Sequence, residues 1–168
     1  MTTVVTLVGN PRSGSRTRAL ADGVVAELSA RAAFDEPHVL ELSELVGVTF
    51  SAEPAVAAAP VADPFAVVRS ARLLVVATPT YKGTYTGLLK VFLDRFGHRE
   101  LAGAVAVPVA IAASEAHRQS VGATLTDLLV ELGATVPAPP LAVLEPDVAD
   151  AAAMWATAHA DAVLAALK

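Results

Sequence analysis

The segment RLLVVATPTYKGTYTGLLKVFLDRF, residues 72–96, indicates the fold class because it joins an apolar, strand-like run to a helical pattern through a polar loop. Residues 72–79 form a continuous apolar run, which is typical of a strand that is buried on both faces. From residue 86 onward, leucines and phenylalanines recur on one side at helical spacing. We therefore predict a strand over 72–79 and a helix over 86–96, joined by a loop with two tyrosines, a lysine and a glycine.

The same alternation of strand and helix runs along the rest of the chain. Further strands are predicted at residues 4–8, 38–45, 104–113 and 135–146. Further helices are predicted at residues 17–33, 64–70, 118–133 and 147–167. The prolines in the last predicted strand place it at an edge of the sheet. This order specifies an α/β fold, in which helices cover both faces of a parallel sheet.

Capping signals locate several helix ends. Asp63 followed by Pro64 predicts an N-cap with proline at the first helical position. Gly133 is expected to end the helix at 118–133 in the left-handed conformation, and Asp147 is expected to cap the last helix. Three prolines predict an irregular surface loop over residues 50–64.

Composition predicts one densely packed domain over residues 1–168. The chain is 54% hydrophobic and only 17% charged, which suits a core rather than a disordered segment. Its net charge is −5, with acidic and basic residues interspersed, so the basic footprint of a nucleic-acid-binding protein is missing. We expect no nucleic-acid partner.

The cysteine content and the lengths of the apolar runs indicate the cellular compartment of the protein. The sequence has no cysteine, which excludes disulfides, thiolate metal sites and a cysteine nucleophile. Its four histidines are far apart in sequence, so we expect no metal site. The first residues lack the basic region of a signal peptide, and no apolar run reaches bilayer length. We expect a cytoplasmic protein with no membrane partner.

Three loops are placed to carry chemistry, because ligands of a doubly wound sheet bind beyond the carboxyl ends of its strands. The first, GNPRSGSRT at 9–17, comes just before a predicted helix, whose N-terminal amides attract phosphate. It offers hydroxyls and two arginines, but Ser15 stands where a Walker A loop has lysine, and the dinucleotide glycine pattern is missing. On these residues alone, phosphate binding and simple helix capping both stay open.

The second loop, TPTYKGTYTG at 78–87, has the residues of a platform for a flat ring. Tyr81 and Tyr85 can stack on a heterocycle, and Gly83 allows its backbone to approach closely. Ordinary packing of the loop is the alternative interpretation. The third loop, ASEAH at 113–117, contributes Ser114, Glu115 and His117.

Taken together, GNPRSGSRT after the first strand and PTYKGTYTGLLKVFLD after the third resemble the NAD(P)H-dependent FMN reductase family. The resemblance spans nearly the whole chain and implies a flavodoxin-like doubly wound fold, with a five-stranded parallel sheet in the order 2-1-3-4-5. Within the family, the chain is most similar to flavin reductases that supply two-component monooxygenases, such as those that act on alkanesulfonates. The lysine after Tyr81 is the pointer to this subgroup.

The resemblance also implies a set of site residues. Arg12, Ser13, Ser15, Arg16 and Thr17 would hold the FMN phosphate. Pro79, Thr80, Tyr81, Lys82 and Gly83 would line the isoalloxazine ring, and Ser114, Glu115 and His117 would lie at its other side. No side chain is expected to act as a catalytic acid or base, since hydride passes directly to the flavin; Lys82 is expected to stabilise negative charge on it.

The implied function is transfer of hydride from NADPH or NADH to flavin N5, with FMN as substrate or cofactor and a monooxygenase as the recipient of reduced flavin. The family also implies a homodimer or homotetramer. Three other functions stay open. The first is an enzyme that uses bound FMN to reduce a quinone, azo compound or metal oxyanion. The second is a non-catalytic, flavodoxin-like electron carrier, and the third is a scaffold that has lost the site.

Overall fold

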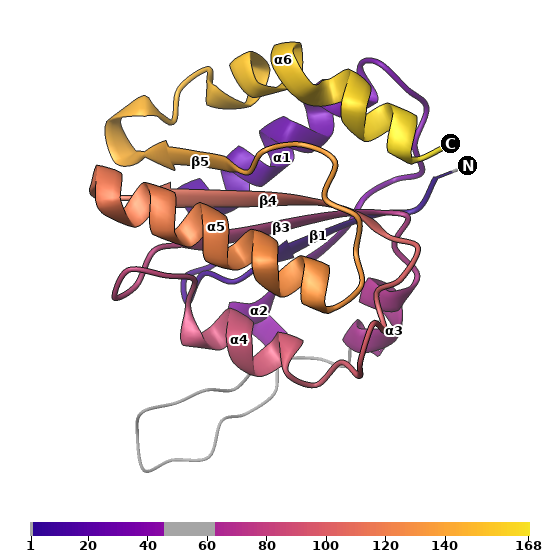
Figure 1. The fold of residues 1–168 in the computed structure, drawn as a ribbon, viewed down its shortest axis with the longest axis horizontal. Coiled ribbons are helices and arrows are strands. Elements are labelled where there is room, and N and C mark those ends of the chain that lie inside the picture. The colour runs from indigo at the N-terminus through magenta and orange to yellow at the C-terminus, as the bar shows by residue number, and fades with distance from the viewer. Residues whose placement is uncertain (1, 46–62) are drawn as a thin grey trace.

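The computed structural model describes residues 2–45 and 63–168, and it shows a parallel sheet between two layers of helices (Figure 1). The strand order is β2-β1-β3-β4-β5, and every neighbouring pair is parallel. Both features were predicted and are confirmed. The strands are β1 (Val4–Val8), β2 (His38–Glu41), β3 (Leu73–Pro79), β4 (Val105–Ala112) and β5 (Leu141–Leu144).

Helices cover both faces of this sheet. The first helix, α1 (Arg16–Ser29), lies with the last, α6 (Ala151–Ala166), on one face. The other face carries α2 (Leu42–Leu45), α3 (Pro64–Arg69), α4 (Gly87–Leu93) and α5 (Glu115–Glu131). A 3-10 turn, η1 (Glu145–Asp147), follows β5. None of the helices formed by the described residues is long and apolar enough to cross a bilayer.

Side chains of β3 alternate between the hydrophobic clusters on the two faces of the sheet, which explains why successive residues of this strand are apolar. Leu73 and Val75 pack on the side of α1 and α6, whereas Leu74 and Val76 pack on the side of α4 and α5. All four side chains are fully buried. Because both faces of the strand are covered, neither set of positions can be polar.

Several element ends differ from those that the sequence predicts. The second strand ends at Glu41, four residues early, because Glu41 pairs with Val8 and β1 extends no further. The chain then forms the short helix α2, which buries Leu42. The first helix ends at Ser29 rather than at residue 33, and the chain turns so that Phe34 packs against the core beside α1 and α6.

The second half of the chain shows two further corrections. Helix α5 begins at Glu115, three residues early, with Ser114 as its N-cap, so the third loop is shorter than predicted. The predicted cap of the last helix is wrong: Asp147 lies in η1, and α6 begins after Asp150, whose φ is +61°. The final strand is confirmed at the sheet edge, but only over Leu141–Leu144.

Other local predictions are confirmed. Asp63 caps α3 by accepting a hydrogen bond from the Phe65 amide, and Pro64 is the first helical residue. Gly133 follows α5 with a φ of +95°. The loop predicted over 50–64 lies outside the described residues, apart from its last two positions.

A tight contact at Gly9 joins the end of β1 to the start of α4. The Gly9 amide donates to the Ala77 carbonyl at 2.8 Å, and the Thr86 hydroxyl donates to the Gly9 carbonyl at 2.5 Å. The same hydroxyl accepts from the Leu89 amide at 3.1 Å and so caps α4. A Cβ on Gly9 would lie 2.7 Å from the Leu89 Cβ, closer than two carbons can pack. Glycine at this position therefore lets the end of β1 pack directly against the start of α4.

We expect Gly9→Ala to lower the free energy of unfolding by about 1–3 kcal/mol, because the new methyl group must push α4 away from the sheet. Urea denaturation measures this change. Gly87→Ala is the matched control, since a Cβ on Gly87 meets no atom within 4 Å and alanine suits a helix better by about 0.5–1 kcal/mol. Equal stabilities for the two variants would contradict the prediction.

Candidate functional site

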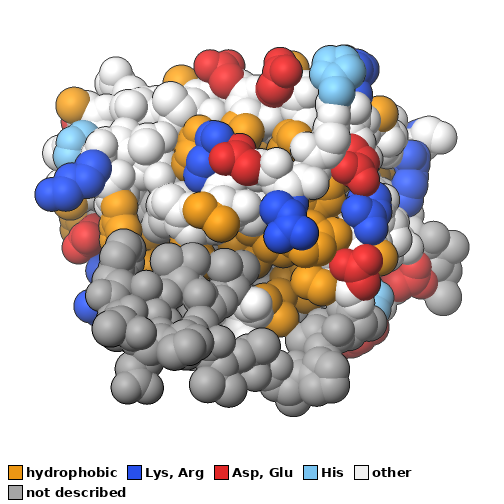
Figure 2. Space-filling view, turned by 90° about the horizontal axis from the view of Figure 1, so that it is seen from below, with side chains coloured by type: hydrophobic (Ala, Val, Ile, Leu, Met, Phe, Trp, Pro, Cys, Tyr) orange, Lys and Arg blue, Asp and Glu red, His pale blue; other side chains and the backbone are white. Residues whose placement is uncertain are grey.

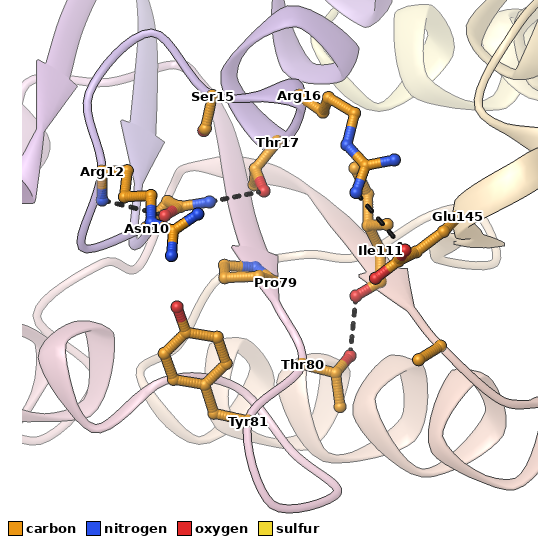
Figure 3. A pocket seen from close by; sticks show the side chains of 11 residues that line it. Asn10, Arg12, Ser15, Arg16, Thr17, Pro79, Thr80, Tyr81, Ile111 and Glu145 are labelled. Carbon is orange, nitrogen blue, oxygen red and sulfur yellow. Dashed lines mark hydrogen bonds and ion pairs between the residues drawn. The ribbon is translucent and has the colours of Figure 1, made fainter.

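A cleft of about 280 Å³ opens at the carboxyl ends of the strands, beside the point where β1 and β3 are neighbours (Figure 3). This is the switch point of a doubly wound sheet, because β2 is added on one side of β1 and β3 is added on the other side. Seven of the predicted site residues line the cleft: Arg12, Ser15, Arg16, Thr17, Pro79, Thr80 and Tyr81. Four others that line it were not predicted: Asn10, Ile111, Ala113 and Glu145.

Asn10 fixes the shape of the loop that follows β1. Its side-chain amide donates to the Thr17 hydroxyl at 3.1 Å, and its side-chain oxygen accepts from the Arg12 amide at 2.9 Å. Asparagine favours such turns because its side chain can bond to nearby backbone groups. The signal for Asn10 was present in the sequence, since it stands between Gly9 and Pro11 directly after a strand.

Helix α1 begins at the wall of the cleft. Ser15 is its N-cap, and its hydroxyl accepts from the Arg18 amide at 3.2 Å. The Gly14 amide donates to a carboxylate oxygen of Glu41 at 3.0 Å, which ties the loop to the end of β2. The positive end of the helix dipole and the remaining amides therefore face the cleft together with the hydroxyls of Ser15 and Thr17.

The two arginines of this loop line opposite sides of the cleft (Figure 3). Arg12 lies on the same side as Tyr81, whose hydroxyl points toward it. Arg16 lies on the other side, 3.4 Å from a carboxylate oxygen of Glu145. Within the described parts of the chain, the Arg12 guanidinium has no ion-pair partner.

The loop after β3 forms the lower wall. Thr80 donates from its hydroxyl to the Ile111 carbonyl at 2.9 Å, which joins this loop to β4. Tyr81 and Thr84 then pair as a tight turn, with backbone hydrogen bonds of 2.9 and 3.3 Å. The Thr84 hydroxyl lies 2.8 Å from that of Thr124 on α5, so the turn is anchored at its far side. Tyr81 itself is 48% exposed, and its ring is available to a ligand.

The other predicted site residues lie outside the lining of the cleft. Ser13 is exposed in the first loop, and Lys82 and Gly83 form the tip of the turn after Tyr81. His117 lies beside that tip, since a Cβ on Gly83 would be 3.7 Å from the His117 ring. Their roles toward a ligand stay predictions.

Two of them begin α5. Ser114 accepts from the His117 amide at 3.3 Å. Glu115 accepts hydrogen bonds from Arg118 and Gln119, and these lower the pKa of Glu115 to about 2. The Glu115 carboxylate is thus engaged along its own helix.

Comparison with known proteins assigns the family. The model of the NADPH-dependent FMN reductase family matches residues 2–149, which include every strand and both principal loops. This chain belongs to that family.

Curated relatives match part of the length of this FMN reductase family member. It is 34% identical over 115 residues to the NADH-dependent FMN reductase SfnF of Pseudomonas putida, a match that covers 68% of this chain and 62% of the relative. It is 43% identical over 61 residues to the FMN reductase (NADPH) of Escherichia coli strain K12, which covers 36% of this chain and 32% of the relative. The chain therefore spans less than two thirds of the length of these relatives.

Solved structures agree on the fold. An NADH:FMN oxidoreductase in its apo form superposes with a TM-score of 0.74 at 24% identity, covering 99% of this chain and 89% of that one. An oxidoreductase from Corynebacterium diphtheriae superposes with a TM-score of 0.72 at 25% identity, covering 99% and 97%. A short-chain flavodoxin superposes with a TM-score of 0.66 at 17% identity over the full length of both chains. The flavodoxin-like fold is thereby confirmed.

The turn at Lys82 and Gly83 carries strain that a substitution can relieve. Both residues have positive φ, +53° and +87°, as a type I′ turn requires, and lysine is poorly suited to this conformation. We expect Lys82→Asn to raise the free energy of unfolding by about 0.5–1 kcal/mol, because asparagine tolerates the left-handed region. Lys82→Ala serves as the control in the same urea titration, because alanine lacks the side-chain amide through which asparagine tolerates the left-handed region. A loss of stability in Lys82→Asn would contradict this account of the turn.

Proposed function

We propose that this protein is an NAD(P)H-dependent FMN reductase. The observation that carries the proposal is the meeting, in one cleft at the switch point of the sheet, of an anion-attracting loop after β1 and a tyrosine-bearing loop after β3. Neither loop is specific alone. Side by side, they match the two ends of FMN, which are a phosphate and a flat ring.

The phosphate end fits the wall made by α1. Arg12, Ser15, Arg16 and Thr17 line it, and they offer two guanidinium groups and two hydroxyls beside the N-terminus of a fourteen-residue helix. Charge-assisted hydrogen bonds of this kind are the ones that phosphate favours. Asn10 holds the loop in shape through its two side-chain hydrogen bonds.

The ring end fits the wall made by residues 79–81. Pro79 and Thr80 stiffen the backbone, the second through its hydrogen bond to Ile111, and Tyr81 offers a flat face. Bound FMN would supply the redox chemistry, by accepting hydride from nicotinamide C4 at its N5. The residues of the chain would orient the two rings and exclude water between them. We propose Lys82 as a source of positive charge near the ring, and equal hydride-transfer rates in wild type, Lys82→Ala and Lys82→Asn would contradict that role.

The finer parts of the proposal rest on the family. One relative is named an NADH-dependent FMN reductase and another an FMN reductase (NADPH), so either nucleotide is a candidate donor. Supply of reduced flavin to a monooxygenase is proposed from the resemblance of the loop after β3. A homodimer or homotetramer is proposed as well. Its support is the face that contains α4, where Val91 is 53% exposed and hydrophobic side chains are uncovered among scattered charges (Figure 2).

The test of the activity is oxidation of NADH and NADPH by purified protein, followed by absorbance with and without added FMN. We expect oxidation that depends on FMN and reduced flavin that leaves the protein. Turnover of a quinone, azo compound or metal oxyanion without release of flavin would favour the alternative enzyme. Protein that binds FMN yet oxidises neither nucleotide would favour an electron carrier, and protein that binds no flavin would favour a scaffold.

The phosphate site gives a sharper prediction. We expect Arg12→Gln to raise the Kd for FMN about tenfold and to leave the Kd for riboflavin unchanged, because riboflavin has no phosphate for the guanidinium to bind. Titration of the apo-protein, followed by quenching of flavin fluorescence, measures both constants.

Arg31→Gln is the matched control, since Arg31 follows the far end of α1 and pairs with Glu27 instead. Equal losses for FMN and riboflavin in Arg12→Gln would place Arg12 at the ring rather than at the phosphate.

A further inference from the structure

Glu145 places a negative charge in the part of the cleft that we assign to phosphate. It comes directly after β5 and reaches the cleft on the side opposite Arg12 (Figure 3). Of the described residues that line the cleft, Glu145 alone is acidic. Its carboxylate lies 3.4 Å from the Arg16 guanidinium, so it partly neutralises one of the two cations there.

This ion pair is weak enough for Arg16 to exchange Glu145 for another anion. The side chains of Arg16 and Glu145 are 64% and 51% exposed, and a single contact joins them. Exposed single-contact pairs of this kind contribute little stability. Glu41, the other carboxylate near this loop, differs: it is 10% exposed and holds both the Gly14 amide and Arg18. The Glu41 carboxylate is therefore held by two partners and is nearly buried, whereas the Glu145 carboxylate is exposed and has a single contact.

A phosphate that binds between the arginines must compete with Glu145 for Arg16. Once bound, the phosphate also faces the Glu145 carboxylate, and like charges at such range repel each other. The geometry points to Glu145 as a residue that weakens the hold of the cleft on the FMN phosphate and so keeps bound flavin exchangeable. This inference rests on the proposed function and deepens it, because a reductase that hands on reduced flavin needs flavin to leave.

The position of the carboxylate separates this role from that of a support for Arg16. A supporting carboxylate would lie behind the guanidinium, away from the ligand. Glu145 instead is one of the residues that line the cleft, and its carboxylate lies below the Arg16 guanidinium in Figure 3. A phosphate that binds Arg16 in this cleft would therefore lie close to the Glu145 carboxylate.

The test compares FMN with riboflavin on Glu145→Gln, a variant that keeps the shape of the side chain and removes its charge. We expect the Kd for FMN to fall about three- to tenfold at low ionic strength, with a slower dissociation rate, and the Kd for riboflavin to stay unchanged. Glu131→Gln is the matched control, because Glu131 is the exposed last residue of α5, which ends near the amino end of β4 and away from the cleft, and the variant changes net charge equally.

The outcomes separate this inference from the proposed function. Wild-type protein that binds neither FMN nor riboflavin would overturn the proposed function and the inference with it. Wild-type binding of FMN with an unchanged or higher Kd in Glu145→Gln would overturn the inference alone. In an Arg16→Gln background we expect Glu145→Gln to tighten FMN by a smaller factor, since only repulsion is then relieved. A larger factor there would overturn the competition for Arg16.

Discussion

The contact between Gly9 and α4 is the constraint on which the cleft depends. Because position 9 has no side chain, Leu89 can pack against its backbone, and the Thr86 hydroxyl can reach the Gly9 carbonyl. That one hydroxyl closes the gap between the end of β1 and the start of α4 and also caps the helix. The loop that leaves β1 and the loop that leaves β3 are consequently held at a fixed separation, so that a ligand can contact both loops without reordering either.

Around this contact, the residues that pack the core lie in the strands, and the residues that could bind a ligand lie in the loops beyond them. Apart from Thr6 and Thr78, the three central strands are apolar on both faces, and the polar residues of the cleft come after the strands end, where backbone and side chains meet solvent. Charge is distributed unevenly there. Glu41 anchors the first loop from β2, while Arg12, Arg16 and Glu145 line the cleft with groups that a ligand can rearrange. Rigid backbone and adjustable charge suit the exchange of flavin that we propose for this site.

The wall beneath the cleft is shaped by hydrogen bonds between distant segments. Thr80 bonds to the Ile111 carbonyl, and Thr84 meets Thr124 of α5, so the turn that carries Tyr81 is held from two sides. Lys82 and Gly83 can then adopt positive φ without loosening the platform. The turn type was not visible in the sequence, because a lysine–glycine pair lacks the asparagine that usually marks such turns.

Apart from the short helix α2, the sequence by itself determined the order of strands and helices, the caps at Asp63 and Gly133, and the two loops that form the cleft, because periodicity and capping are local properties. It missed the early end of β2, since that depends on where β1 stops, and it placed the cap of α6 wrongly at Asp147. Only the tertiary structure decided that Glu145 joins the cleft and faces Arg16, more than a hundred residues away in the chain. Such contacts follow from strand order and register, which bring distant chain segments to one edge of the sheet.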